Sequence, residues 1–335
     1  MSTNSDVTDL LKQGVNEGNI GMVKEALDNG APPNTIFNAD WGWNVLDRAI
    51  YHGSIPIIEM LLDAGADVNH LDVQNENCLF KAIELNNLDI IKKIVEKGAN
   101  VNQASIDQGL TPMCISLSNR NLPIAQYLIE KGAKINPFEP DGSVPFSLAI
   151  DNAEADEDLS LLIDFLLDAG LNINAQDYKG WTPIMRTIKK GMKKTAKHLI
   201  ERGANVNLQN NDGNNPVFEA ALKDDTEFIE WILSAGGNPE NSLPSGFSPL
   251  MVACKMGFQK SCEILVNAGA EVNKKDGAGL TPLMYAASNN VDIVRMLLKN
   301  NAVLKATCNQ GKTALDYAHE FENMEAYNEL KSFVH

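Results

Sequence analysis

The phrase LLDAGADVN, at residues 61–69, decides the fold of this chain because copies of it recur along most of the sequence. Each copy has an apolar helical end, then Gly-Ala or a variant of it, then an apolar residue and often Asn. Close copies read IVEKGANVN at 94–102, LIEKGAKIN at 128–136, LLDAGLNIN at 166–174, LIERGANVN at 199–207 and LVNAGAEVN at 265–273, with weaker copies at 26–34, 232–240 and 297–305. Self-similarity of this kind is the signature of a repeat architecture.

The spacing of the copies gives the length of the repeating unit. From Gly30 to Asn301, which replaces the glycine of the last copy, the successive steps are 35, 33, 34, 38, 33, 33, 33 and 32 residues. A unit of about 33 residues therefore repeats. The single step of 38 predicts an insertion between the two helices of the fifth unit, where the acidic residues Glu154, Asp156, Glu157 and Asp158 lie.

A second phrase, which often contains Thr-Pro, precedes the copies by about twenty residues. It reads LTPMCISL from residue 110, WTPIMRTI from 181, FSPLMVAC from 247, LTPLMYAA from 280 and KTALDYAH from 312. Thr111, Thr182 and Thr281 are suitable N-caps, and the proline after each fits the first helical position. The second helix ends at the recurring Gly, which can adopt the left-handed C-cap conformation, and Asn, Asp and Gly then supply a hairpin-like loop.

The two phrases and their period resemble the ankyrin repeat family, which carries the signature T-P-L-H-x-A. The resemblance spans essentially the whole chain and implies an all-α solenoid, elongated and curved, with a helix-turn-helix and a β-hairpin loop in each repeat. We expect one array over residues 1–335, with repeats at 9–34, 40–69, 73–102, 107–136, 140–174, 178–207, 211–240, 244–273, 277–305 and 309–335, the first and last as caps.

The chain departs from this family at the His of the signature. The residues in its place are Asp47, Phe80, Cys114, Ser147, Met185, Phe218, Met251, Met284 and Asp316. We expect every repeat to lose the local Thr–His hydrogen bond for this reason.

The composition restricts the partners and the compartment. A formal charge of −16 and a pI near 4.7 disfavour nucleic acids and acidic membrane surfaces. Five cysteines, an odd number without a C-x-x-C pair, disfavour a disulfide framework and fit a reducing compartment. The sequence has no basic, apolar leader and no long apolar run, so we expect a cytoplasmic protein, with the nucleus as an alternative.

We expect neither catalysis nor a cofactor. The nearest metal motif, at residues 208–219, resembles a calcium loop but has Leu208 at its first ligand position. Histidines and cysteines do not cluster at zinc-ligand spacing, and neither a G-x-S-x-G motif nor a phosphate-binding glycine loop occurs. The sequence therefore predicts no enzyme, no metal site and no cofactor.

The resemblance implies binding through the hairpin tips and the adjoining first helices, which line a concave face. On that basis we expect partner contacts at Trp41, Trp43, Tyr51, His52, Tyr178, Trp181, Lys189, Lys190, Phe247 and Met256. Lys189 and Lys190, both expected to be exposed, form with their neighbours a basic island in the sixth repeat that could take an acidic, extended peptide. The alternatives are that Trp41 and Trp43 seal the junction behind the weak first repeat and that the lysines form a plain solvated face.

These observations predict a non-catalytic scaffold or adaptor that binds another protein along its concave face, and a monomer when free. Two alternatives stay open. The chain could be a permanent structural subunit of a larger assembly, for example a cytoskeletal or ciliary one. It could also be an inhibitor that occludes the active site of an enzyme.

Overall fold

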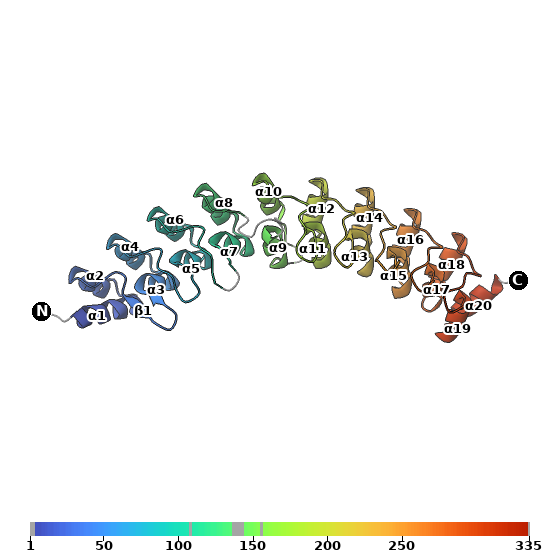
Figure 1. The fold of residues 1–335 in the computed structure, drawn as a ribbon, viewed down its shortest axis with the longest axis horizontal. Coiled ribbons are helices and arrows are strands. Elements are labelled where there is room, and N and C mark those ends of the chain that lie inside the picture. The colour runs from blue at the N-terminus through green and yellow to red at the C-terminus, as the bar shows by residue number, and fades with distance from the viewer. Residues whose placement is uncertain (1–3, 107–108, 136–143, 155–156, 334–335) are drawn as a thin grey trace. The chain divides into compact units, whose positions relative to one another are not determined.

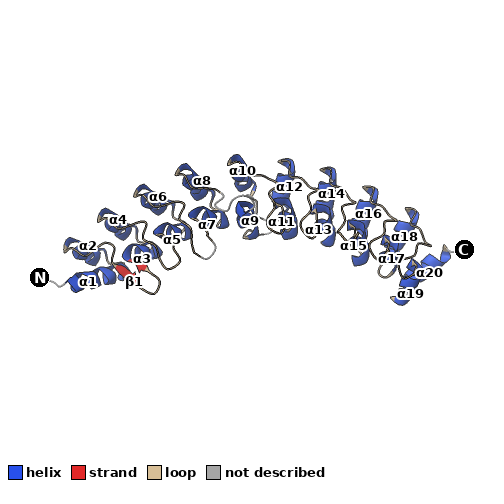
Figure 2. Cartoon of the chain, in the orientation of Figure 1, coloured by secondary structure: helices blue, strands red, loops and turns tan. Residues whose placement is uncertain are grey.

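The computed structural model describes residues 4–106, 109–135, 144–154 and 157–333, and it is built almost entirely of short helices (Figure 2). Contacts divide the chain into two compact units, residues 1–140 (unit 1) and residues 141–335 (unit 2). The predicted repeat boundaries at 107, 136, 140 and 335 lie outside the described residues. No described helix is both long enough and apolar enough to span a lipid bilayer.

Unit 1 contains four helix pairs and one pair of short strands among its described residues. Its elements are α1 (Asn4–Glu17), α2 (Ile20–Asp28), β1 (Ile36–Asn38), β2 (Trp43–Asn44), α3 (Val45–His52), α4 (Ile55–Asp63), α5 (Cys78–Glu84), α6 (Leu88–Glu96), α7 (Pro112–Ser118) and α8 (Leu122–Glu130).

Unit 2 contains six helix pairs among its described residues. They are α9 (Val144–Asp151), α10 (Ser160–Asp168), α11 (Pro183–Lys190), α12 (Lys193–Glu201), α13 (Pro216–Leu222), α14 (Thr226–Ser234), α15 (Pro249–Met256), α16 (Gln259–Asn267), α17 (Pro282–Ala287), α18 (Val291–Lys299), α19 (Ala314–Glu320) and α20 (Met324–Ser332). The insertion predicted in the fifth repeat does fall between its two helices, α9 and α10, although residues 155–156 are not described.

Within each unit, the first helix of a pair packs on the first helix of the next pair, as α3 does on α5 and α11 on α13 (Figure 1). The second helices form a second layer, as α10, α12 and α14 do. The apolar faces meet between the layers, so Ile90, Ile91 and Ile94 of α6 are fully buried. Val95, the next residue of α6, is half-buried. The all-α repeat fold is confirmed in both units.

Local capping starts and ends these helices as the sequence predicts. The Thr182 side chain accepts a hydrogen bond from the Met185 N–H at 3.4 Å, and proline follows the cap. At the end of α12, Gly203 adopts a φ of +88°, and the Ala204 N–H donates to the Leu199 carbonyl at 2.9 Å. This C-terminal geometry needs a residue that tolerates the left-handed region, which explains the recurring glycine.

In four of the described repeats the residue in place of the signature His returns a hydrogen bond to the cap, through a Met sulfur in α15 and α17 and through an aspartate in α3 and α19. In α3, the Asn44 N–H donates to Asp47 Oδ2 at 3.0 Å while the Asp47 N–H donates to Asn44 Oδ1 at 2.9 Å. Thr313 and Asp316 form the same reciprocal cap in α19. The two aspartates therefore restore local hydrogen bonds that we expected the repeats to lose.

The predicted hairpins are mostly turns without strands. In the described residues only β1 and β2 pair as strands, in an antiparallel register with an irregularity between Ile36 and Asn38. The other described loops close through one backbone bond, such as Asp177 N–H to the Trp181 carbonyl at 3.1 Å. In four of them an aspartate or asparagine side chain also accepts turn N–H groups, as Asp177 does. These loops are too short to extend the backbone bond into a ladder.

Asparagines at the end of the recurring phrase join successive repeats. Asn207 Nδ2 donates to the Gly236 carbonyl at 2.9 Å, and its Oδ1 accepts the Asn238 N–H at 2.8 Å. Asn69 and Asn102 make the equivalent pairs of bonds in unit 1. These bonds form an asparagine ladder between neighbouring loops, and they explain why the phrase ends in Asn so often.

Candidate interaction surfaces

A large cleft of unit 2 lies where the sequence placed its basic island. It has a volume of about 850 Å³ and is formed by the loop of residues 177–181 with α9 and α11. We call it the basic cleft, and its lining residues are Ser147, Asp151, Asp177, Tyr178, Lys179, Trp181, Arg186, Lys189 and Lys190. All four predicted contacts of the sixth repeat therefore line one surface.

Asp177 fixes the loop that carries the aromatic side chains of the basic cleft. Its Oδ1 accepts the N–H groups of Lys179 and Trp181, each at 2.8 Å. A Cβ on Gly180 would lie 2.8 Å from the backbone nitrogen of Asn211 in the next loop, so glycine permits the two loops to pack closely. As a result Trp181 is half-buried, whereas Tyr178 is 81% exposed.

Some cations of the basic cleft already form ion pairs with carboxylates of the chain, and others do not. Arg186 makes ion pairs with both Asp151 and Asp177. Lys189 is exposed, and its Nζ lies 4.5 Å from the centre of the Trp181 ring. Among the described residues, neither Lys189 nor Lys179 forms a salt bridge, so both charges are available to a partner.

Lys190 is not the freely exposed side chain that we expected. Its Nζ donates to the carbonyl of Asp151 at 2.6 Å and to that of Ala153 at 2.7 Å, and the residue is half-buried. These carbonyls follow α9, where unpaired carbonyls and the helix dipole favour a cation. Lys190 therefore holds the chain that follows α9, and Lys189 and Lys179 are the lysines of the cleft for which no salt bridge is found in the described residues.

The two residues predicted in the eighth repeat do not line the basic cleft. Phe247 is half-buried in an aromatic row, with its ring centre 6.3 Å from that of Phe218 and 5.2 Å from that of Tyr285. Met256 is 51% exposed at the end of α15. Sequence reasoning missed Tyr285, whose hydroxyl donates to Asp276 Oδ2 at 2.6 Å and whose place in the repeat matches that of Arg186.

Unit 1 has a smaller cleft, of about 280 Å³, beside its tryptophans. We call it the acidic cleft, and it is lined by Trp41, Trp43, Asp72, Val73, Gln74, Glu76, Lys81 and Glu84. The ring of Trp43 lies 5.1 Å from Trp41 and 5.4 Å from Tyr51, centre to centre. Tyr51 and His52 continue this aromatic row outside the cleft.

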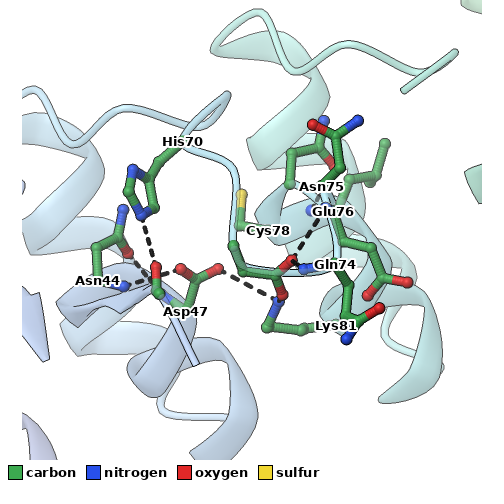
Figure 3. Close-up of polar contacts among 12 residues, drawn as sticks. Asn44, Asp47, His70, Gln74, Asn75, Glu76, Cys78 and Lys81 are labelled. Atoms are coloured by element: carbon green, nitrogen blue, oxygen red, sulfur yellow. Dashed lines mark hydrogen bonds and ion pairs between the residues drawn. The ribbon is translucent and has the colours of Figure 1, made fainter. Parts of the chain in front are cut away.

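A buried ion network forms the base of the acidic cleft (Figure 3). Lys81, only 5% exposed, reaches Asp72 Oδ2 at 2.8 Å and Asp47 Oδ1 at 3.8 Å with its Nζ. The same Nζ lies 5.0 Å from the centre of the Trp43 ring. Burial raises the pKa of Asp47, and the charge of Lys81 opposes this rise.

The sequence analysis missed this network. The sequence indicates the network at one place, the lysine inside the apolar run LFKAI at residues 79–83. A lysine buried in such a run requires an anionic partner. The described residues contain no cluster of three His, Cys, Asp or Glu side chains that could hold a metal ion.

Two family models match the chain. A model of three ankyrin repeats matches residues 69–139, 146–242, 184–276 and 250–332, and a model of many ankyrin repeats matches residues 11–62 and 46–84. Together these matches cover most of the sequence. A comparison with curated proteins finds no match.

Proposed function

The chain belongs to the ankyrin repeat family, whose repeats generally serve as protein–protein interaction modules, and we propose that it holds an extended, acidic peptide of a partner protein in the basic cleft. It acts as a scaffold or adaptor, by affinity and not by turnover. We further propose the cytoplasm or the nucleus as its location. These compartments are reducing, and all five cysteines are buried free thiols.

One observation carries this proposal: two lysines that form no salt bridge within the described part of the chain lie beside aromatic rings on a protein whose formal charge is −16. Lys189 lies over Trp181, and Lys179 lies 5.4 Å from the ring centre of Tyr178. Carboxylates of an extended peptide can pair with these lysines while its apolar groups cover the rings. The excess of positive charge selects an acidic partner and speeds its association.

The test is the binding of a fluorescent peptide that alternates glutamate with leucine, followed by anisotropy. The double variant Lys179→Glu and Lys189→Glu should lower the affinity about tenfold or more, mainly through slower association, and should flatten its salt dependence. Lys190 stays intact because it stabilises the fold. Lys194→Glu, on the exposed side of α12 and outside the cleft, is the matched control and should bind nearly as the wild type.

Equal binding by the double variant and the wild type would show that the acidic peptide uses another surface. Circular dichroism of each variant verifies that the helices are intact. Size-exclusion chromatography of a native extract then separates a transient scaffold from a permanent subunit, which would elute only in a large assembly. A partner enzyme that loses activity when bound would identify the chain as an inhibitor.

A further inference from the structure

We propose that the acidic cleft of unit 1 binds an arginine side chain from a basic segment of a partner protein, with the Trp41 ring and the carboxylates of Glu76 and Glu84 as its contacts. This site is separate from the basic cleft and has the opposite charge preference. The proposal stands whether or not the acidic peptide binds in unit 2.

The indole ring of Trp41 is exposed beside the acidic cleft. Trp41 is 53% exposed, and its ring meets Trp43 edge-on, at an interplanar angle of 60°. This arrangement leaves a large indole surface in contact with water, which is unfavourable unless a partner covers it. Tryptophan in such a position is typical of the residues that dominate binding energy in interfaces.

Two glutamates, Glu76 and Glu84, place negative charge beside these rings. Lys81 forms its ion pairs with Asp47 and Asp72 and not with Glu76 or Glu84. In the described part of the chain, the carboxylates of Glu76 and Glu84 form neither a salt bridge nor a hydrogen bond. Burial and the neighbouring carboxylates of Asp72 and Glu84 raise the pKa of Glu76, and the nearby charge of Lys81 only partly opposes this rise.

Cations of the chain already lie over other aromatic rings of this surface. Lys81 lies over Trp43, and the guanidinium of Arg48 lies 5.1 Å from the ring centre of Phe37 and 5.6 Å from that of Tyr51. Trp41 has no such cation among the described residues, although tryptophan is the aromatic side chain that binds cations best. A cation from a partner protein would give Trp41 the same kind of contact.

The size and rigidity of the cleft favour arginine. A volume of about 280 Å³ is at the lower limit for a ligand site, so it suits one long side chain. A guanidinium can stack on an indole and pair with a carboxylate at the same time, whereas an ammonium is a compact point charge. The loop is fixed in advance, because Asp72 Oδ1 accepts the N–H groups of Gln74 and Glu76 and the Val73 N–H donates to the Trp41 carbonyl.

The experiment measures the binding of a fluorescent peptide that alternates arginine with serine to the full chain, with matched lysine and glutamate peptides. We expect the arginine peptide to bind best, the lysine peptide several times more weakly and the glutamate peptide not at this site. Binding should also weaken as the pH falls through the raised pKa of Glu76, because this carboxylate then takes up a proton and loses its charge.

Two variants test the assigned contacts independently. Glu76→Gln combined with Glu84→Gln keeps the shape and removes the charge, and Trp41→Ala removes the ring; each should lower the affinity for arginine about tenfold. Glu96→Gln, an exposed glutamate of α6 outside the cleft, is the charge-matched control and should change little. Since Trp41 is half exposed, circular dichroism should show an unchanged fold.

The double lysine variant of the basic cleft separates this proposal from the previous one, because it should still bind the arginine peptide. Arginine binding that survives in both acidic-cleft variants, or an arginine peptide that fails to bind the wild type at millimolar concentration, would overturn the assignment. Equal affinity for arginine and lysine peptides would refute the stacking of a guanidinium.

Discussion

Replacing Lys81 by Met would test whether the buried ion network holds the first-helix layer of unit 1 together. Methionine fills nearly the same volume, so packing is largely kept, but Asp47 and Asp72 would be left buried without their cation. Removal of one partner from a buried ion pair costs about 3–5 kcal/mol, and loss of the cation over Trp43 adds about 1 kcal/mol. We expect a loss of this size in the free energy of unfolding of the affected repeats.

The dependence of the loss on pH distinguishes electrostatics from packing. Lys81 lowers the pKa of Asp47 against the effect of burial, so the variant should raise that pKa further. The folded state would then take up a proton more readily than the unfolded state, and its stability would increase as the pH falls through the raised pKa. The deficit should therefore be largest at neutral pH and smaller in acid.

Urea unfolding followed by circular dichroism measures the loss, and hydrogen exchange locates it in α3 and α5. Lys97→Met, which breaks the exposed pair between Lys97 and Asp63, is the matched control and should change stability by about 0–1 kcal/mol. A deficit for Lys81→Met below 1 kcal/mol, or one that is the same at every pH, would refute the argument.

Other expected outcomes follow from single contacts. Gly203→Val should lower the free energy of unfolding, measured in urea, by about 1–3 kcal/mol. The cause is backbone strain at a φ of +88° and not a clash, because the new Cβ meets no neighbouring atom. Gly203→Asn should lower it less, since asparagine tolerates this conformation better. Asn207→Ala should cost about 1–2 kcal/mol and speed amide exchange at residues 236–238, because three hydrogen bonds to the next repeat are lost. Cys254, fully buried and with its pKa raised by burial, should react with a chromogenic disulfide reagent only after unfolding; prompt reaction in the native protein would contradict that burial.

The features that the sequence predicted well are local. A Thr-Pro start and a Gly end each involve residues within one turn of a helix, so Thr182 and Gly203 could be placed without knowledge of the fold. The buried charge of Lys81 could not be placed in this way, because its partner Asp47 belongs to the preceding repeat. The same reason explains Lys190, which bonds to carbonyls of the preceding repeat.

Some of the predicted contact residues line the two clefts. Trp41 and Trp43 line one, and the four residues from the sixth repeat line the other, while their role in binding stays a prediction. The basic island was visible in the sequence, but the charge that each cleft leaves unpaired was not, because it depends on which ions already pair with one another. Arg186 adds no free charge for this reason, while Glu76 does.

The asparagine ladder has a consequence for how such a chain can change over evolution. In the described residues each rung joins one repeat to the next. Asn69, Asn102, Asn207 and Asn273 each make the same two bonds, and Asn34 and Asn174 make one of them. A gene duplication or deletion of one whole repeat therefore leaves such an asparagine with an equivalent neighbour. Glu240, which stands where most copies have Asn, differs: it accepts the Glu271 N–H and pairs with Lys274. That junction is matched by charge, so its two repeats are not interchangeable with the others.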